Sequence, residues 1–345
     1  MSETAVIFST LGDQGGIGPE LVARTLERPE ATAGVKRLVV GRKDVLDRGR
    51  EIAGVDIDIP VYTDITSAVE SSELVVFLHH ADAGSDTVTM GKSTVAAGRS
   101  DLAVARFAAD LSRTGQVDAF VFAPVNKKSL SLGGSDFEGY KAYIADYLGI
   151  GGTSAEINTI GPLWTTRISS HIPIAEVPRY VTKDRILEIV RYFDRELRRF
   201  GYDDPKIAVA GLNPHNGDGG LFGREEIDEI GPAVEAARQS GLNVDGPFSP
   251  DTVFVTAQER GVAGIVSMYH DQCQIATKLL GFDEGVTYFG GLPFPITTPA
   301  HGTAFDIAGQ GVASAKPMLN ALRLARRAAL VARGLAVPTG SDHAI

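Results

Sequence analysis

Cysteine is almost absent from this sequence: Cys273 is the only one among 345 residues. A single cysteine excludes an intrachain disulfide framework, and it also excludes a metal cluster held by thiolates of one chain. Any bound metal must therefore use histidine and carboxylate ligands.

An excess of basic residues is also lacking, because the formal net charge is −10. Nucleic acids and anionic membrane surfaces both require a basic face, so neither is an expected partner. No apolar run is long enough to cross a bilayer. The N-terminus passes directly into the strand-like run Ala5–Ser9, without the basic segment and cleavage site of a signal peptide. We therefore expect a cytoplasmic protein that acts on a small molecule.

Both common nucleotide-binding fingerprints are missing. The glycine-rich loop Gly12–Glu20 leads from a strand-like run into a helix, but its glycines do not fit the spacing Gly-x-Gly-x-x-Gly. The segment Gly91–Thr94 ends like a P-loop, but Asp86 stands where the first glycine is required. A cofactor, if present, is not held by a classical Rossmann or P-loop motif.

What the sequence does contain is an alternation of short apolar runs with longer segments of helical periodicity. This α/β pattern predicts a largely parallel sheet covered by helices. No repeat, low-complexity tract or flexible linker divides the chain, and the last residues, 338–345, are expected to fray. The predicted strands are residues 5–9, 37–40, 74–78, 119–123, 207–212 and 264–268, and the predicted helices are 19–28, 94–114, 183–200, 224–240 and 316–333.

Four histidines occur in loops after apolar strands or beside glycines: His171, His215, His270 and His301. Each one alone has a structural interpretation, as a histidine with satisfied hydrogen bonds. Together they also fit a catalytic metal, which three neutral imidazoles hold while one coordination position stays open. The long separations do not establish such a site, and both interpretations remain open on the residues alone. His215 lies in the glycine-rich stretch Asn213–Glu226, at the expected mouth of a sheet.

A series of ordered motifs covers nearly the whole chain and resembles the 4-hydroxythreonine-4-phosphate dehydrogenases of vitamin B6 synthesis and their paralogues. The resemblance implies the two-domain α/β/α architecture of isocitrate and isopropylmalate dehydrogenases. We expect a first domain of residues 1–130 plus 288–345, and a second of 131–287 that carries the metal ligands and a dimer interface. The motifs are Gly12–Glu20, Ala123–Lys127, Ser170–Pro173, Gly211–His215, Gly223–Glu226, Gly246–Phe254, Met268–Gln272 and His301–Gly309.

The resemblance also implies a site. It makes His171, His215 and His270 the ligands of a divalent metal at a homodimer interface, with Asp251 approaching that metal and Lys278 contacting substrate. Imidazole ligands favour zinc, while Mg, Mn and Co are also compatible. NAD or NADP would lie along the loop His301–Gly309, where small residues allow close approach of the backbone. The cofactor-binding residues implied there are His301, Gly302, Thr303, Ala304 and Asp306.

The substrate end departs from the family pattern. Tyr140 and Lys141 replace a histidine and a threonine, Thr287 replaces an asparagine, and Ile296 replaces an arginine that binds phosphate. Isoleucine cannot supply the bidentate bonds of a guanidinium. We therefore predict a substrate without phosphate, such as a terephthalate-type cis-dihydrodiol. The alternatives are 4-phosphohydroxy-L-threonine and a phosphorylated four-carbon sugar acid.

The predicted activity is that of a divalent-metal-dependent NAD(P) dehydrogenase that oxidises a hydroxy acid or vicinal diol, with decarboxylation. Lys127 is the candidate for proton transfer, although a surface lysine is an equal interpretation. Asp271 either orients the His270 imidazole or caps the following helix. Two other classes remain: a transferase of acyl or phosphoryl groups without redox chemistry, and a non-catalytic ligand-binding paralogue.

Overall fold

The computed structural model describes residues 4–84, 86, 88–137, 139–151, 155–281 and 283–337, and the predicted tail 338–345 lies outside them. The described chain forms two compact units. Unit 1 consists of the residues up to Gly151 and those from Leu292 onward, and unit 2 consists of the segment between them. The sequence-based division instead separated the domains after residue 130 and before residue 288.

Unit 1 contains a parallel sheet with the strand order β3-β4-β2-β1-β5-β12. Strands β1, β2 and β5 are buried along their whole length, as expected for a parallel sheet covered on both faces. The strands are β1 (Ala5–Thr10), β2 (Val35–Gly41), β3 (Val61–Tyr62), β4 (Val75–His79), β5 (Ala119–Phe122) and β12 (Ile296–Pro299).

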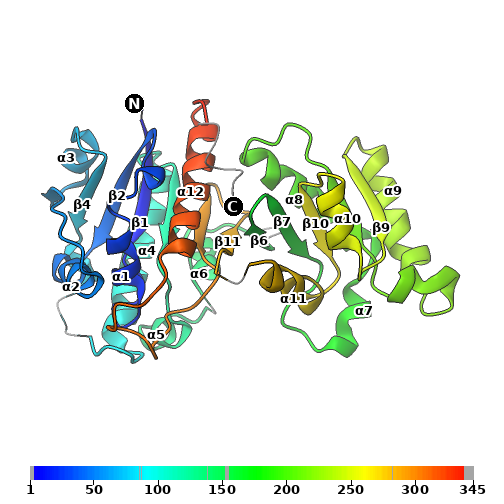
Figure 1. Ribbon diagram of the computed structural model, residues 1–345, viewed down its shortest axis with the longest axis horizontal. Helices are drawn as coiled ribbons and strands as arrows, with labels where there is room; N and C mark the ends of the chain where they lie inside the picture. The colour runs from blue at the N-terminus through cyan, green and yellow to red at the C-terminus, as the bar shows by residue number, and fades with distance from the viewer. Residues whose placement is uncertain are drawn as a thin grey trace. The chain divides into compact units, whose positions relative to one another are not determined.

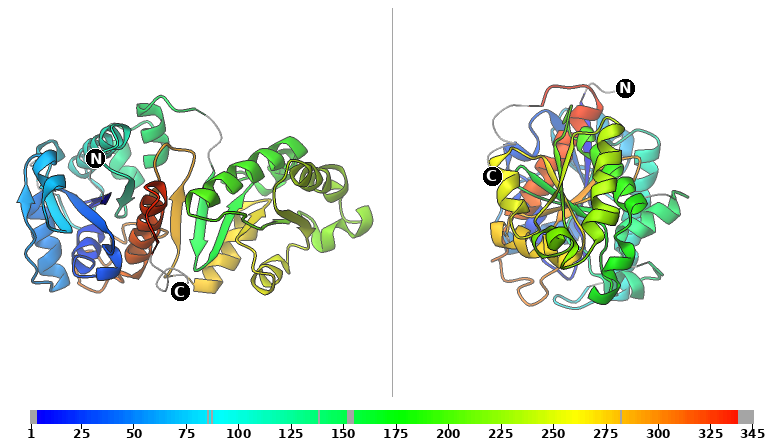
Figure 2. Two further views of the ribbon diagram at one scale, coloured as in Figure 1. Left: turned by 90° about the horizontal axis from the view of Figure 1, so that it is seen from above. Right: turned by 90° about the vertical axis from the view of Figure 1, so that its right-hand side faces the viewer.

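Helices cover both faces of this sheet, with α4 on one side and α1, α2 and α12 on the other (Figure 2). Thr94 caps α4 by accepting a hydrogen bond from the Ala97 amide, and Gly54, at φ 65°, ends α2. The helices of unit 1 are α1 (Gly18–Arg24), α2 (Lys43–Ala53), α3 (Ile65–Glu70), α4 (Val95–Arg113), α5 (Lys127–Leu132), α6 (Tyr140–Tyr147) and α12 (Lys316–Ala332), with 3₁₀ turns at Pro29–Ala31 and Ala81–Ala83.

Unit 2 contains a mixed sheet with the strand order β11-β6-β7-β10-β8-β9 (Figure 1). The neighbours β7, β10, β8 and β9 are parallel to one another. Strand β6 pairs antiparallel with both β7 and β11. The strands are β6 (Glu156–Ile160), β7 (Leu163–Arg167), β8 (Ile207–Ala210), β9 (Val244–Phe248), β10 (Gly264–Ser267) and β11 (Val286–Phe289).

The helices of unit 2 also bury apolar side chains on one face. The long helix α8 is capped by Thr182, whose side chain accepts from the Arg185 amide, and it buries Ile186, Ile189 and Phe193. The helical segments are α7 (Val177–Tyr180), α8 (Lys183–Arg199), α9 (Gly231–Gln239), α10 (Val253–Glu259) and α11 (His270–Gly281), with 3₁₀ turns at Ile174–Glu176 and Pro214–Gly220 and a π-helical turn at Glu226–Ile230.

The predicted α/β fold class is confirmed, and each of the predicted strands and helices has a counterpart in the structure. The predicted helix 224–240 is a π-helical turn followed by α9 rather than one regular helix. The sequence analysis did not find β3, which is two residues long. It also did not find β6, β7, β9, β11 or β12, because polar residues or prolines interrupt their apolar pattern. Among the described residues, no helix is both long and apolar enough to span a bilayer.

Candidate active site

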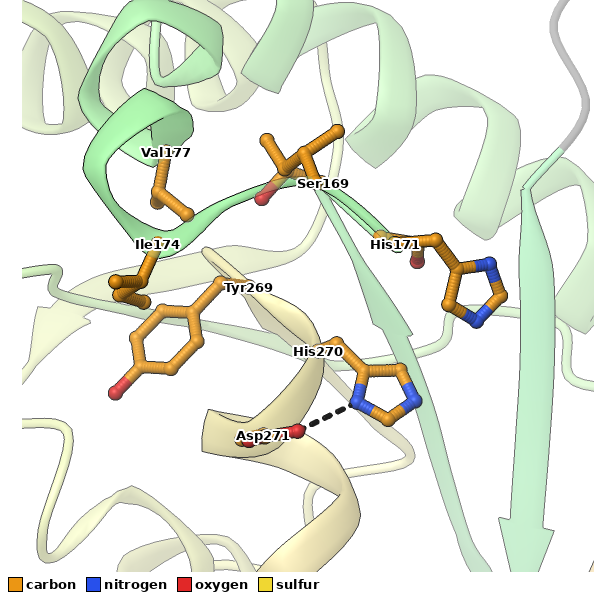
Figure 3. Close-up of a pocket in the computed structure, with 9 residues that line it drawn as sticks. Ser169, His171, Ile174, Val177, Tyr269, His270 and Asp271 are labelled. Carbon is orange, nitrogen blue, oxygen red and sulfur yellow. Dashed lines mark hydrogen bonds and ion pairs between the residues drawn. The ribbon is translucent and has the colours of Figure 1, made fainter.

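Two of the predicted metal ligands, His171 and His270, lie next to each other in unit 2. His171 lies in the loop after β7, and His270 is the first residue of α11, which begins shortly after the end of β10. Because β7 and β10 are parallel neighbours, with Arg167 in register with Ser267, their carboxyl ends bring both histidines to the same edge. The ring centroids are 5.4 Å apart, and Figure 3 shows the two imidazoles turned to the same side.

Asp271 contacts the ring of its neighbour His270. Its Oδ1 atom lies 2.6 Å from the His270 Nδ1 atom (Figure 3). A carboxylate on Nδ1 favours the tautomer in which Nε2 carries a lone pair, and that tautomer can bind a metal. Asp271 was expected either to orient the His270 imidazole or to cap the helix, and the contact present in the structure is the one with the imidazole.

A pocket of about 300 Å³ adjoins the histidine pair. One part of its wall is polar and includes both imidazoles with Ser169 and Ser170. The other part is apolar and aromatic, and Figure 3 places Ile174, Val177 and the Tyr269 ring there, away from the imidazoles. The pocket therefore offers metal-ligating nitrogens and a surface for an apolar group within the same unit.

The third histidine, His215, lies in a loop after β8, the strand that neighbours β10. Several successive residues of this loop have positive φ, including His215 at 53° and Asn216 at 56°. The buried carboxylate of Glu226 holds the loop: its Oε1 atom accepts from the amides of Leu212 and Asn213, both at 2.7 Å. This support fixes a backbone that non-glycine residues rarely adopt.

Asp251 lies within electrostatic reach of His215 in the same chain. The hydroxyl of Ser249 donates to its Oδ1 atom at 2.7 Å, and this bond, together with backbone hydrogen bonds, lowers the pKa of the Asp251 carboxyl. The structure thus brings His171 and His270 into contact, while Asp251 and His215 interact electrostatically.

Within the described ranges, no group of three or more His, Cys, Asp or Glu side chains lies close enough together to hold a metal ion. The full set of three histidine ligands therefore stays a prediction. The donors that the structure does bring together, imidazole nitrogens with a carboxylate behind one of them, are the type that zinc and similar ions prefer.

The predicted cofactor loop belongs to unit 1 and packs against the glycine-rich loop Gly12–Glu20. The Ile17 amide donates to the Thr303 carbonyl at 3.1 Å, and a Cβ atom on Gly16 would come within 2.9 Å of the Thr303 Cβ. Gly302 has open space around it, whereas Ala304 has a φ of 41°. The loop Gly12–Glu20, which does not match the dinucleotide-binding spacing, thus supports the predicted cofactor loop.

The other residues of the cofactor loop lie near the surface. His301 is half-buried, and its Nδ1 atom lies 3.0 Å from the Gly302 carbonyl oxygen. The carbonyl of Asp306 accepts from Gln310 Nε2 at 2.8 Å. The P-loop-like segment Gly91–Thr94 contacts the same glycine-rich loop, because the Gly91 amide donates to the Gly15 carbonyl at 2.8 Å.

Asn126 is a site residue that the sequence analysis did not single out. Its Nδ2 atom lies 3.5 Å from Thr303 Oγ1, while its Oδ1 atom caps α5 by accepting from the Ser129 amide at 3.0 Å. Lys127, the candidate for proton transfer, is the next residue and is exposed at the start of α5. Asn126 belongs to the Ala123–Lys127 motif, and that motif was the signal in the sequence that could have identified it.

The predicted substrate residues are exposed to different degrees. Tyr140 is 2% exposed, its hydroxyl donates to the Asp101 carbonyl at 2.8 Å, and its ring packs on Phe122. Ile296 is fully buried in β12. Lys141 and Thr287 are half-buried, and Lys278 is exposed on α11. Only the last three present surface to a ligand, so a direct substrate contact by Tyr140 or Ile296 stays a prediction.

Comparisons with known proteins give consistent results. Residues 34–325 match the family described as "Pyridoxal phosphate biosynthetic protein PdxA". A Pseudomonas aeruginosa protein named provisionally as a second 4-hydroxythreonine-4-phosphate dehydrogenase is 43% identical over 320 residues, which cover 92% of this chain and 95% of the relative.

Two solved structures are also similar. The crystal structure of 4-hydroxythreonine-4-phosphate dehydrogenase from Klebsiella pneumoniae is 35% identical, has a TM-score of 0.84, and aligns over 94% of this chain and 98% of its own. A terephthalate 1,2-cis-dihydrodiol dehydrogenase from Burkholderia xenovorans LB400 is 25% identical, with a TM-score of 0.66 and coverage of 97% and 100%.

Proposed function

We propose the function of this chain from one premise: it belongs to the family of the pyridoxal phosphate biosynthetic protein PdxA. The chain is a cytoplasmic NAD(P)-dependent dehydrogenase that acts on CH–OH groups. It uses one divalent metal, with zinc favoured, to oxidise a hydroxy acid or a vicinal diol, and decarboxylation follows. The relatives named as dehydrogenases support this reaction class.

The observation that carries the proposal is the histidine pair. The imidazoles of His171 and His270 lie 5.4 Å apart, and Asp271 contacts the nitrogen of His270 that a metal would not use. In the proposed site, His171, His215 and His270 hold the metal, and Asp251 approaches it. A metal bound there lowers the pKa of a coordinated hydroxyl and stabilises negative charge that develops on the substrate oxygen.

The chain's own residues bind and orient the reactants. Lys127 is the candidate base that would take the proton of the substrate hydroxyl, and a bound nicotinamide would supply the acceptor for the hydride from the same carbon. If the new carbonyl lies β to a carboxylate, the bond to that carboxylate breaks, carbon dioxide leaves, and the electron pair remains as an enolate that is then protonated. The loop His301–Gly309 would hold the nicotinamide cofactor through its backbone and through Thr303, Ala304 and Asp306.

The substrate itself is proposed from the pocket beside the histidine pair. Its apolar wall of Ile174, Val177 and Tyr269 suits an aromatic ring, and position 296 carries no guanidinium for a phosphate. We therefore propose a diol without phosphate, such as a terephthalate-type cis-dihydrodiol, and the dihydrodiol dehydrogenase relative supports it. Higher identity to a 4-hydroxythreonine-4-phosphate dehydrogenase favours a second candidate, 4-phosphohydroxy-L-threonine or a phosphorylated four-carbon sugar acid.

The proposal includes a homodimer. Unit 2 exposes large apolar side chains that a monomer would leave in water, among them Ile275 at 60% and Leu279 at 83% exposure, one turn apart on α11. Phe222, in the loop after His215, is 51% exposed. A second copy of the chain that covers these residues would remove apolar surface beside the proposed metal ligands.

The decisive experiment is a substrate panel with reduction of NAD and of NADP as the readout. The panel contains aromatic carboxylate cis-diols, 4-phosphohydroxy-L-threonine and phosphorylated four-carbon sugar acids. We expect turnover of a diol, its loss after treatment with a chelator, and its recovery with zinc. Full activity after complete removal of metal would disprove metal dependence. Absence of NAD(H) and NADP(H) binding in calorimetry would favour a non-redox transferase or a ligand-binding protein instead.

A further inference from the structure

A buried arginine, Arg167, joins the loop of the histidine pair to the neighbouring strand β6 of unit 2. It is the last residue of β7, and its side chain is 2% exposed. The Nε atom donates to Ser170 Oγ at 2.5 Å, Nη1 donates to Asn158 Oδ1 at 2.8 Å, and Nη2 pairs with Glu156. Each arm of the guanidinium is thus used, and a planar fork with all arms bonded has little freedom to move.

The first arm supports the loop of the ligand histidine. Ser170 directly precedes His171, whose φ of 48° is unusual for a residue with a side chain. Such a conformation persists only where the surroundings enforce it. The Arg167 bond to Ser170 and the Ser169 hydroxyl, which donates to the Met268 carbonyl at 2.8 Å, hold the two residues before His171.

The second arm orients a carboxamide at the junction of three elements. Asn158 Oδ1 accepts from Arg167 and also from Gln274 Nε2 on α11, at 2.7 Å. With the oxygen fixed by two donors, the amide nitrogen points to β11 and donates to Thr287 Oγ1 at 3.1 Å. Asn158 and Thr287 are directly paired across β6 and β11. The Thr287 hydroxyl oxygen therefore accepts a hydrogen bond from Asn158, and its own proton can be donated to an acceptor on a ligand.

Helix α11 connects this network to the histidine pair. His270, Gln274 and Lys278 follow one another at intervals of one helical turn, so they share a face of the helix. The contact of Gln274 with Asn158 turns that face toward β6. A metal-ligand candidate, the amide network and the exposed ammonium of Lys278 are thus aligned along one helix.

We propose that Arg167 is a positioning residue of the dehydrogenase site, which fixes the His171 loop through Ser170 and orients Thr287 through Asn158. The inference rests on the proposed function for its chemistry, while the hydrogen-bond network is a property of the structure alone. The Thr287 hydroxyl and the Lys278 ammonium both donate, so the group that they receive is an oxygen acceptor such as a carboxylate.

The test uses Ser170→Ala, Arg167→Lys and the double variant in the full chain. Zinc is titrated calorimetrically into chelator-stripped protein, and hydrogen exchange is measured for the peptide that covers residues 168–173. Each single variant is expected to bind zinc about tenfold more weakly. This is the lower end of the loss in metal affinity that follows removal of a group hydrogen-bonded to a metal ligand. Exchange of the peptide should be faster in both. The double variant should be no weaker than Arg167→Lys, because both changes break the same link.

Two further variants separate positioning from general stability. Arg37→Lys makes the same change at a fully buried arginine of unit 1, which donates to Thr25 and Ser9, and it should bind zinc like the unmodified chain. Thr287→Val should leave zinc binding unchanged and raise KM for the substrate found in the panel. Arg167→Lys should change both quantities.

Unchanged zinc affinity and unchanged exchange in Ser170→Ala and Arg167→Lys would overturn the inference. If Arg167→Lys does not fold, Ser170→Ala decides alone, because it removes only the hydroxyl. If the unmodified chain binds no zinc, the proposed metal dependence fails, and the exchange rates still decide whether Arg167 holds the His171 loop.

Discussion

At the scale of single residues, burial separates side chains that a ligand can reach from those that hold the fold. His171 and Lys278 are exposed, whereas Tyr140 and Ile296 are buried. Matching a motif assigns a position to each of these residues but says nothing about its exposure. The side chains of Tyr140 and Ile296 therefore act on the packing of unit 1.

Ile296→Arg is expected to destabilise the protein rather than simply restore a phosphate contact. Ile296 is fully buried in β12, and an unpaired charge in the interior costs on the order of several kcal/mol. Thermal denaturation should show a clear loss of stability for Ile296→Arg, while Ile296→Leu, which conserves volume, should cost less than about 1.5 kcal/mol. An Ile296→Arg variant as stable as its parent would mean that this position opens to solvent.

Asp101→Asn is expected to stabilise the protein at neutral pH. Burial, together with the charge of Asp13, raises the pKa of the Asp101 carboxyl well above its ordinary value, and its Oδ2 atom has no hydrogen-bond partner among the described residues. Because the folded state holds this proton more tightly, the protein loses stability as pH rises from the ordinary carboxyl pKa toward the raised one. Asparagine stays neutral, so the gain should be on the order of 1–3 kcal/mol at neutral pH.

The gain should vanish in acid, below the ordinary carboxyl pKa, where Asp101 is protonated in both states. Denaturant titrations at several pH values measure it, with the exposed Asp58→Asn as the control, which should change stability by no more than about 0.5 kcal/mol. A gain that is equal at acidic and neutral pH would contradict the assignment of the effect to this proton.

At the scale of elements, the stretch Asn213–Glu226 combines what was predictable with what was not. The apolar run and the glycines indicated a strand followed by a loop, and β8 does end at Ala210. The sequence could not indicate that Glu226 reaches back to the start of the loop, because that contact depends on the π-helical turn that places its carboxylate. The shape of the His215 loop follows from that one buried side chain.

Glu226→Gln tests this dependence. The amide of glutamine places a donor where the carboxylate accepts from two backbone amides and from Asn213 Nδ2, so at least one donor loses its partner. We expect a loss of about 1–3 kcal/mol in the free energy of unfolding, together with weaker zinc binding because His215 moves with the loop. Asp228→Asn is the matched control: it breaks an exposed ion pair with Arg224 and should cost less than about 1 kcal/mol. Equal effects of the two variants would refute the special role of Glu226.

At the scale of the whole molecule, the alternation of apolar runs and helical segments was sufficient to predict an α/β fold with a largely parallel sheet. The strands β6 and β11 were not predictable in the same way. They carry polar residues such as Asn158 and Thr287, and these two strands pair with each other although they are far apart in sequence. Their pairing is decided by the sheet that they join, so the division of the chain into units also depends on tertiary contacts.

The oligomeric state is a prediction at this scale. If α11 lies in a homodimer interface, Leu279→Asp, at a side chain 83% exposed, should shift the protein toward monomers, because a buried aspartate without a partner opposes association. Light scattering measures the mass over a dilution series. Leu74→Asp, at a leucine 50% exposed in unit 1, is the control and should leave the mass unchanged. A stable, active monomer in the unmodified chain would contradict the proposed dimer.

The sequence by itself determined the fold class, the family and the candidate residues, because hydrophobic periodicity and ordered motifs are local properties of the chain. Only the tertiary structure decided which candidates meet. His171 and His270 are neighbours because β7 and β10 are, and strand order is a long-range property that no local pattern carries. The same holds for the burial of Tyr140 and Ile296 and for the bonds of Arg167, since each depends on elements that folding brings together.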